Sequence, residues 1–145
     1  MTGVRRGWIL LLAATAIAAA ACGGEPRLPE MHLSTDSYSF TIIPSLSPPH
    51  AREPILYKII VKDRKSQQPI QDGEGQIFAN TREGARTYDG LIYGPEVGTY
   101  YGKLNYTLAD LWAVAIRFRR DSLHPLERQD WMQDVLAERS DSTPK

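Results

Sequence analysis

The sequence predicts an all-β domain, a β-sandwich, followed by one C-terminal amphipathic helix. Three observations support this prediction. Apolar and polar residues alternate in several short segments, as they do in strands that bury one face. Turn-forming residues separate these segments roughly every ten positions, which is the spacing typical of a sandwich. No segment before residue 122 has apolar residues at sustained helical spacing.

The N-terminus has the pattern of a cleavable export signal. Arg5 and Arg6 precede an apolar run from Trp8 to about Ala18, and three alanines stand directly before Cys22. The apolar run is shorter than the roughly 20 residues that a membrane-spanning helix needs. We therefore predict a signal peptide over residues 1–21, with an uncleaved membrane helix as the alternative. The two arginines fit the ordinary export route and faintly resemble a twin-arginine signal.

Cys22 is the candidate lipidation site. The order Ala-Ala-Ala-Cys resembles the lipobox of bacterial lipoproteins, which implies a diacylglycerol on the thiol of this cysteine. Cys22 is the only cysteine, so the mature chain has no internal disulfide and no second thiol for catalysis. Two acyl chains hold a protein stably at a membrane, whereas one holds it only marginally. We expect a lipid-anchored protein on the extracytoplasmic, periplasmic face of the cell envelope.

The charge balance argues against a nucleic-acid-binding protein. The 17 basic residues include Arg5 and Arg6, and all 17 acidic residues lie beyond the signal peptide. The mature chain therefore carries 15 basic and 17 acidic residues, a net charge of about −2. Nucleic-acid-binding domains are usually basic, so we expect no nucleic-acid partner.

After a flexible tether over residues 22–33, the sandwich is expected over residues 34–121. Strands are predicted near residues 37–42, 55–61, 74–81, 86–93, 99–106 and 111–120. Four prolines between residues 44 and 54 mark a long connection, and the last two strands are close enough for a hairpin. The inward faces predict a core of Phe40, Ile42, Tyr57, Ile59, Val61, Ile77, Leu104, Trp112, Val114, Ile116 and Phe118, with Trp112 at its centre.

The helix is expected within residues 122–140. Pro125 suits a first helical turn, and the apolar residues Leu126, Trp131, Met132, Val135 and Leu136 recur near helical spacing. This apolar stripe has two possible roles. It folds back over an open end of the sandwich, or it presents Trp131 and Met132 to a partner protein, since such side chains are favoured at interfaces.

Two predicted strands begin with the motifs Gly98-Thr99-Tyr100 and Asp110-Leu111-Trp112. These motifs resemble the strand starts of the FixH and YtkA-like extracytoplasmic domains. The polar turn from Asp63 to Pro69 and the strand after Gly73 belong to the same resemblance, which covers roughly residues 52–120. Asp110 stands where that family has glycine. The resemblance implies an immunoglobulin-like β-sandwich, with Tyr100 as its corner tyrosine. It further implies an accessory or assembly protein of membrane electron-transfer complexes, in some members linked to copper, although the Met-rich segment of those members is missing here.

The candidate metal ligands are few and widely spaced. Copper would suit Met31, His32 and His50 if the proline-rich connection folded back across the tether. His124 has no ligand partner at short spacing, and Asp72-Gly73-Glu74 is more typical of a turn than of a calcium loop. Exposed histidines without a ligand role are the simpler interpretation, so we expect no cofactor.

The sequence contains none of the common catalytic motifs. We find no Gly-x-Ser-x-Gly elbow, no His-Glu-x-x-His helix and no phosphate-binding glycine loop. No acidic residue lies within an apolar run where burial would adjust its pKa for acid or base catalysis. We therefore expect a protein that is not an enzyme.

A basic strip is the candidate partner-binding surface. If the last two strands pair as neighbours, Lys103, Arg117 and Arg119 project from one outer face, where arginine could bind carboxylates in a bidentate manner. A solvated face kept soluble by charge is the alternative. Taken together, the sequence favours a non-catalytic, lipid-anchored interaction module, an accessory subunit docked on an integral membrane protein complex. A small-ligand or copper carrier is the alternative function.

Overall fold

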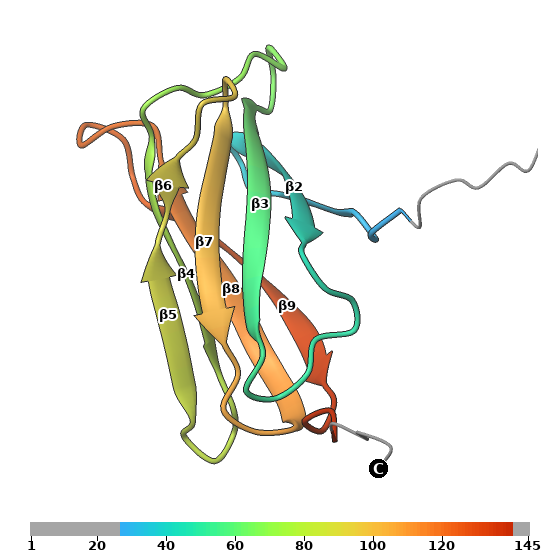
Figure 1. The fold of residues 1–145 in the computed structure, drawn as a ribbon. Helices are drawn as coiled ribbons and strands as arrows, with labels where there is room; N and C mark the ends of the chain where they lie inside the picture. Colours follow the sequence, from blue (N-terminus) through green and yellow to red (C-terminus); the bar gives the residue numbers. More distant parts are fainter. Residues whose placement is uncertain (1–26, 141–145) are drawn as a thin grey trace, which may run out of the picture.

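In the computed structural model, which describes residues 27–140, the chain forms two antiparallel sheets packed face to face (Figure 1). The strands are β1 Met31–Ser34, β2 Tyr38–Pro44, β3 Pro54–Asp63, β4 Glu74–Asn80, β5 Arg86–Gly90, β6 Ile92–Tyr93, β7 Thr99–Asn105, β8 Asp110–Arg119 and β9 Glu127–Val135. One sheet has the order β1-β2-β3-β7-β6 and the other the order β5-β4-β8-β9. The predicted β-sandwich is confirmed. Residues 27–140 include no helix, and therefore none that could span a membrane.

The predicted core is confirmed. Every residue named for it from the sequence is at most 1% exposed, because strict alternation sends each of these side chains between the sheets. Trp112 is the largest fully buried side chain, and its indole N–H donates to the carbonyl oxygen of Leu108 at 3.1 Å. Its ring meets that of Tyr106 edge to face, which combines apolar burial with a favourable aromatic geometry.

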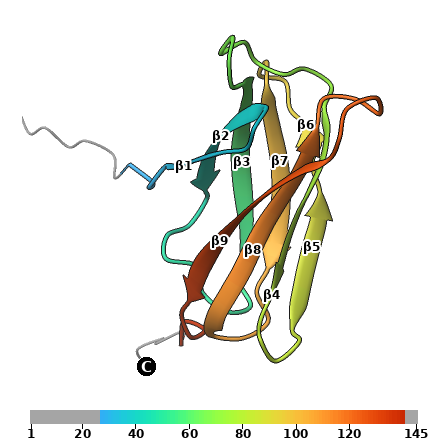
Figure 2. The ribbon, with the colours of Figure 1, turned by 180° about the vertical axis from the view of Figure 1, so that it is seen from behind.

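The predicted C-terminal helix is wrong, because residues 127–135 form strand β9. This strand lies beside β8 (Figure 2) and pairs antiparallel with it. In this register Trp131 lies opposite Val114. Trp131 and Val135 both face the core at strand spacing. The polar residues between them disguise that alternation in the sequence. The sandwich therefore extends well past residue 121, and its last strand completes the core.

The predicted tether is too long at its C-terminal end. Met31–Ser34 form β1, which pairs with β2 and places Met31 opposite Ile42. Met31 and Leu33 pack against the core from this edge. The folded domain therefore begins near residue 31.

The predicted strand over residues 86–93 is divided between the two sheets. β5 pairs with β4, whereas β6 pairs with β7 in the opposite sheet. Leu91 lies between them, donates its N–H to the carbonyl oxygen of Gly75 at 2.9 Å and packs against the core. A Cβ on Gly102 would lie 2.9 Å from Leu91 Cδ2 and 2.6 Å from Ile77 Cγ2, so glycine is needed where the chain crosses.

β7 and β8 do not form the predicted hairpin, because residues 106–109 carry the chain from one sheet to the other. Tyr100 on β7 is also not a local corner tyrosine. Its hydroxyl donates to the carbonyl oxygen of Ile70 and accepts from the N–H of Gly73, both at 2.8 Å and far upstream in sequence. These two hydrogen bonds hold the connection between β3 and β4 against the buried side of β7.

Candidate functional site

The predicted basic strip is not assembled, since its residues lie on different sheets. Lys103 is exposed on β7, whereas Arg117 and Arg119 lie on the outer face of β8. Arg119 is neutralised by Glu74, whose carboxylate accepts from its guanidinium at 2.7 Å. Of the three predicted residues, only Arg117 belongs to the surface described below.

Trp131 and Met132 point to opposite faces of β9, as successive strand residues do. Trp131 is buried and its ring lies 6.3 Å from that of Tyr57, so its prediction as a partner-binding residue is wrong. Its indole nitrogen is buried without a hydrogen-bond partner in the described part of the chain. Met132 is 58% exposed on the outer face and remains available for contact.

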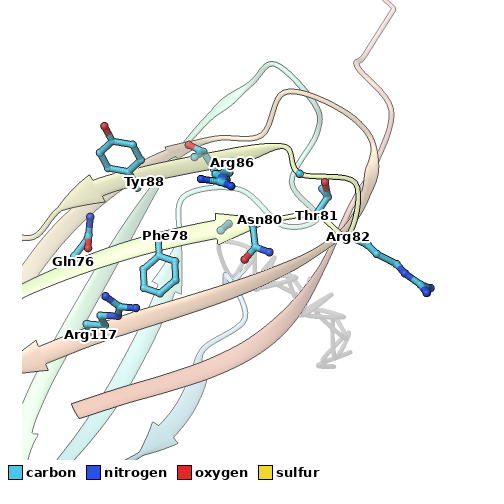
Figure 3. A pocket seen from close by; sticks show the side chains of 11 residues that line it. Gln76, Phe78, Asn80, Thr81, Arg82, Arg86, Tyr88 and Arg117 are labelled. Carbon is cyan, nitrogen blue, oxygen red and sulfur yellow. The ribbon is translucent and has the colours of Figure 1, made fainter. Parts of the chain in front are cut away.

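The structure places a hollow of about 560 Å³ on the outer face of the sheet β5-β4-β8-β9. We name it the Phe78 hollow. Its lining residues come mainly from β4, β5 and the turn between them, with one contribution from β8 (Figure 3). They are Gln76, Phe78, Ala79, Asn80, Thr81, Arg82, Gly84, Arg86, Thr87, Tyr88 and Arg117.

Phe78 lies at the centre of this face because its neighbours Ile77 and Ala79 are buried and alternation turns its own ring outward. Tyr88 stands directly opposite it on β5 and is 73% exposed. Residues opposite each other in an antiparallel pair share one face, so the two rings are neighbours. The sequence shows this alternation, but the sequence-based prediction of a partner-binding surface included neither Phe78 nor Tyr88.

Two guanidinium groups lie over the ring of Phe78. Arg117 Cζ is 4.9 Å and Arg128 Cζ 5.1 Å from the ring centroid, which is within the range of cation–π attraction. Arg128 is also held by Asp130, with its shortest contact at 2.6 Å, and this carboxylate raises the pKa of the guanidinium. Two positively charged groups therefore lie beside this aromatic ring.

The hollow carries an excess of positive charge. Among residues 27–140, no carboxylate forms an ion pair with Arg82, Arg86 or Arg117, whereas the neighbouring Arg119 and Arg128 are paired. A guanidinium offers planar, bidentate hydrogen bonds to carboxylates. Beside it, the half-buried ring of Phe78 and the exposed ring of Tyr88 offer apolar area, and the amides of Gln76 and Asn80 can donate or accept hydrogen bonds. The arrangement suits binding of an acidic, partly apolar surface.

The residues proposed for copper do not converge. Met31 packs toward the core, whereas His32 lies on the opposite face of β1 and contacts Thr41 Oγ1 through Nδ1 at 3.2 Å. His50 Nδ1 donates to the carbonyl oxygen of Ala137 at 2.8 Å, beside the end of β9. Within the described residues, no three His, Cys, Asp or Glu side chains are grouped so as to hold a metal ion.

Cys22 and the signal peptide over residues 1–21 lie outside the described residues, so both stay predictions from the sequence.

No protein-family model matches the chain, and a search of curated proteins finds no match. Among solved structures, the fold is similar to the crystal structure of a DUF4426 family protein from Pseudomonas aeruginosa PAO1. The TM-score is 0.57 at 8% sequence identity, over 76% of this chain and 97% of the other. At this identity the likeness concerns the fold alone, and the chain shares the two-sheet β-sandwich architecture of that protein.

Proposed function

We propose that the protein is a non-catalytic interaction module that docks on a membrane protein through the outer face of the sheet β5-β4-β8-β9. The observation that carries this proposal is the half-buried ring of Phe78 beside the exposed ring of Tyr88, set on an open sheet among guanidinium groups that form no ion pair within residues 27–140. Aromatic and arginine side chains are the types most often responsible for binding energy at protein interfaces. Met132 extends the exposed apolar surface along the same face.

The location at a membrane is proposed from the sequence. The pattern of the first 21 residues and the single cysteine at position 22 support a lipid anchor on the extracytoplasmic side. A lipid anchor confines the domain to the membrane surface, where a modest docking affinity is sufficient because the local concentration of the partner is high.

The strand order supports an immunoglobulin-like arrangement. Apart from the additional edge strands β1 and β5, the order β2-β3-β7-β6 opposite β4-β8-β9 corresponds to the two sheets of the constant-type immunoglobulin sandwich. The likeness to FixH and YtkA-like domains adds a class of partner, a membrane-embedded electron-transfer complex that this protein would stabilise or help to assemble. Copper delivery is the alternative role suggested by the same likeness.

The docking surface can be tested with the full-length chain, captured through a C-terminal tag from membranes in mild detergent. Tyr88→Ala and Arg117→Glu should each reduce recovery of the copurifying membrane protein, by about 2 kcal/mol in affinity if the residue is central. Leu56→Ala and Lys103→Glu are the matched controls, because both residues lie on the outer face of the other sheet. Equal recovery with all four variants, at unchanged melting temperatures, would reject the proposed face.

The anchor and the metal alternative have separate tests. Cys22→Ser should release the domain from the membrane fraction, and retention after a high-salt wash with residues 1–21 still present would show a true membrane helix. A copper carrier should gain thermal stability on addition of copper, whereas a docking module should not respond.

A further inference from the structure

Strand β9 is the longest edge strand in the described residues. It pairs with β8 on one side only and spans nine residues, against four in β1, five in β5 and two in β6. An unpaired edge presents a row of backbone N–H and C=O groups that a further strand can bind.

The direction of these groups follows from Leu136, the residue directly after β9. Its N–H donates to the carbonyl oxygen of Pro49 and its own carbonyl oxygen accepts from Ala51, both at 2.9 Å and both away from β8. In an antiparallel strand, residues two apart direct both backbone groups to the same side. The backbone groups of Arg128, Asp130, Met132 and Asp134 therefore face the open edge.

The side chains of β9 agree with this direction. The amide nitrogens of Gln129 and Gln133 donate to the carbonyl oxygens of Asp130 and Asp134, at 3.4 and 3.0 Å. These carbonyl oxygens thus take hydrogen bonds from their own strand and none from β8. Side-chain donors of this kind can be exchanged for the backbone N–H groups of an added strand.

The open stretch has fixed ends. Residues 49–51 occupy the edge beside Leu136, and at the other end Pro125 has no N–H to offer a ladder. Arg128 to Asp134 therefore remains available, with its midpoint at Trp131. If a two-fold axis passes through that midpoint, the four residues whose backbone groups face the edge all pair with the same four residues of a second copy. Any other antiparallel register leaves some of these four residues without a partner.

The charges select the same register. Centred on Trp131, Arg128 of one copy lies opposite Asp134 of the other, twice across the axis, and Asp130 lies opposite Met132. A register centred on Asp130 would set that carboxylate against itself, and one centred on Met132 would set Asp130 against Asp134. Like charges directly opposite are destabilising, whereas opposite charges stabilise a cross-strand pair.

We propose that β9 pairs antiparallel with β9 of a second copy of this chain, joining two four-stranded sheets into one continuous sheet of eight strands. The interface is isologous, as is usual for homodimers. The two Phe78 hollows then lie on the same continuous face. This pairing uses the backbone edge of β9 and none of the residues that line the Phe78 hollow. Two of its residues, Arg128 and Met132, lie beside the proposed docking face.

The charge relationship can be tested on the full-length chain in mild detergent, with mass measured by native mass spectrometry and sedimentation. The parent chain should be dimeric. Arg128→Asp and Asp134→Arg should each weaken the dimer about tenfold, because two attractive contacts become repulsive, and the double variant Arg128→Asp/Asp134→Arg should restore it. Lys103→Glu, on the other sheet, should have no effect. A monomeric parent chain, or a double variant no tighter than the single ones, would overturn the proposal.

The register can be tested by disulfide formation. Opposed hydrogen-bonded residues lie about 5.5 Å apart between Cα atoms, within disulfide reach. The double variant Asp130→Cys/Met132→Cys should therefore form a cross-linked dimer on mild oxidation. Neither single variant should do so above the level of the parent chain, which contains Cys22. Equal cross-linking by Asp130→Cys alone would place the axis elsewhere and overturn the proposed register.

Discussion

The hydroxyl groups of Tyr57 and Tyr106 lie 2.7 Å apart and satisfy one another inside the core. Tyr57 comes from the middle of β3, and Tyr106 directly follows β7 in the same sheet. Both side chains are at most 1% exposed, so neither hydroxyl can turn to solvent in place of its partner. The pair is a polar contact surrounded by apolar side chains. Removing one hydroxyl should therefore destabilise the fold differently from removing both.

Tyr106→Phe should lower the free energy of unfolding by about 1–3 kcal/mol, because it leaves the hydroxyl of Tyr57 buried without a partner. Tyr57→Phe/Tyr106→Phe should cost clearly less than the sum of the single changes, because no polar group is then left unsatisfied. Chemical denaturation of the parent chain, of Tyr57→Phe, of Tyr106→Phe and of the double variant gives the coupling free energy between the two hydroxyl groups. Additive effects would show that the hydroxyls are satisfied independently.

Stability should fall at alkaline pH. Burial raises the pKa of Tyr57 and of Tyr100 to about 12 and raises that of Tyr106 further. An unfolded tyrosine loses its proton near pH 10, so above that pH the unfolded chain binds fewer protons than the folded one. The free energy of unfolding should therefore decline between about pH 10 and 12. Tyr57→Phe/Tyr106→Phe should decline less steeply in the same denaturation series.

The Asp63 turn should respond to acid. Its carboxylate accepts from the backbone N–H groups of Ser66 and Lys65 and from the guanidinium of Arg120, and these bonds lower the pKa of Asp63 to about 2. Their contribution to stability should be complete above about pH 4 and lost as the pH falls through 2. Carboxyl NMR titration measures this midpoint. Arg120→Gln should raise it, and an unchanged midpoint would exclude Arg120 as a cause.

Trp131→Ala should destabilise the domain by about 3–5 kcal/mol, because it removes a large side chain from the core. Met132→Ala, one residue along on the outer face, is the matched control and should change stability by about 0.5 kcal/mol or less. Deletion of residues 126–145 should abolish cooperative unfolding, since it removes β9 entirely. A cooperative transition in that deletion variant would show that β9 is dispensable.

Gly102→Ala should destabilise the domain by about 1–3 kcal/mol, because the new Cβ would contact Ile77 and Leu91 too closely. Gly90→Ala tests the same change where nothing lies within 4 Å of the added atom. That variant should be neutral or slightly stabilised, through a less flexible unfolded chain. Thermal unfolding of both variants separates steric crowding from a general effect of removing glycine.

The central strands were predictable because they are buried on one face along their whole length. The alternation of Tyr57, Ile59 and Val61 is unbroken, and so is that of Trp112, Val114 and Ile116. Strand β9 was not recognised because it lies at the rim of a sheet. Its inward positions at Gln129 and Gln133 reach solvent and carry polar side chains, so the pattern with period two is interrupted.

The strand order and the candidate site were harder to predict from the sequence. Lys103 and Arg117 were expected on one face because the connection between their strands was interpreted as a hairpin. A connection of four residues can also cross between two sheets, so its length alone does not distinguish the two arrangements. The Phe78 hollow depends on which strands are neighbours. Phe78 could be placed on an outer face by its buried neighbours, whereas the approach of Arg117 and Arg128 to its ring required the register of three strands.

Leu91 marks the point where one continuous run of backbone leaves the sheet β5-β4-β8-β9 and enters the sheet β1-β2-β3-β7-β6. A shearing force applied to either layer is therefore carried by covalent bonds into the other layer, and does not depend on side-chain packing alone. The layers can slide apart only after the chain detaches from β4 on one side or from β7 on the other. Under mechanical force, a domain whose two sheets are joined in this way should unfold in one step, without an intermediate in which one sheet remains folded.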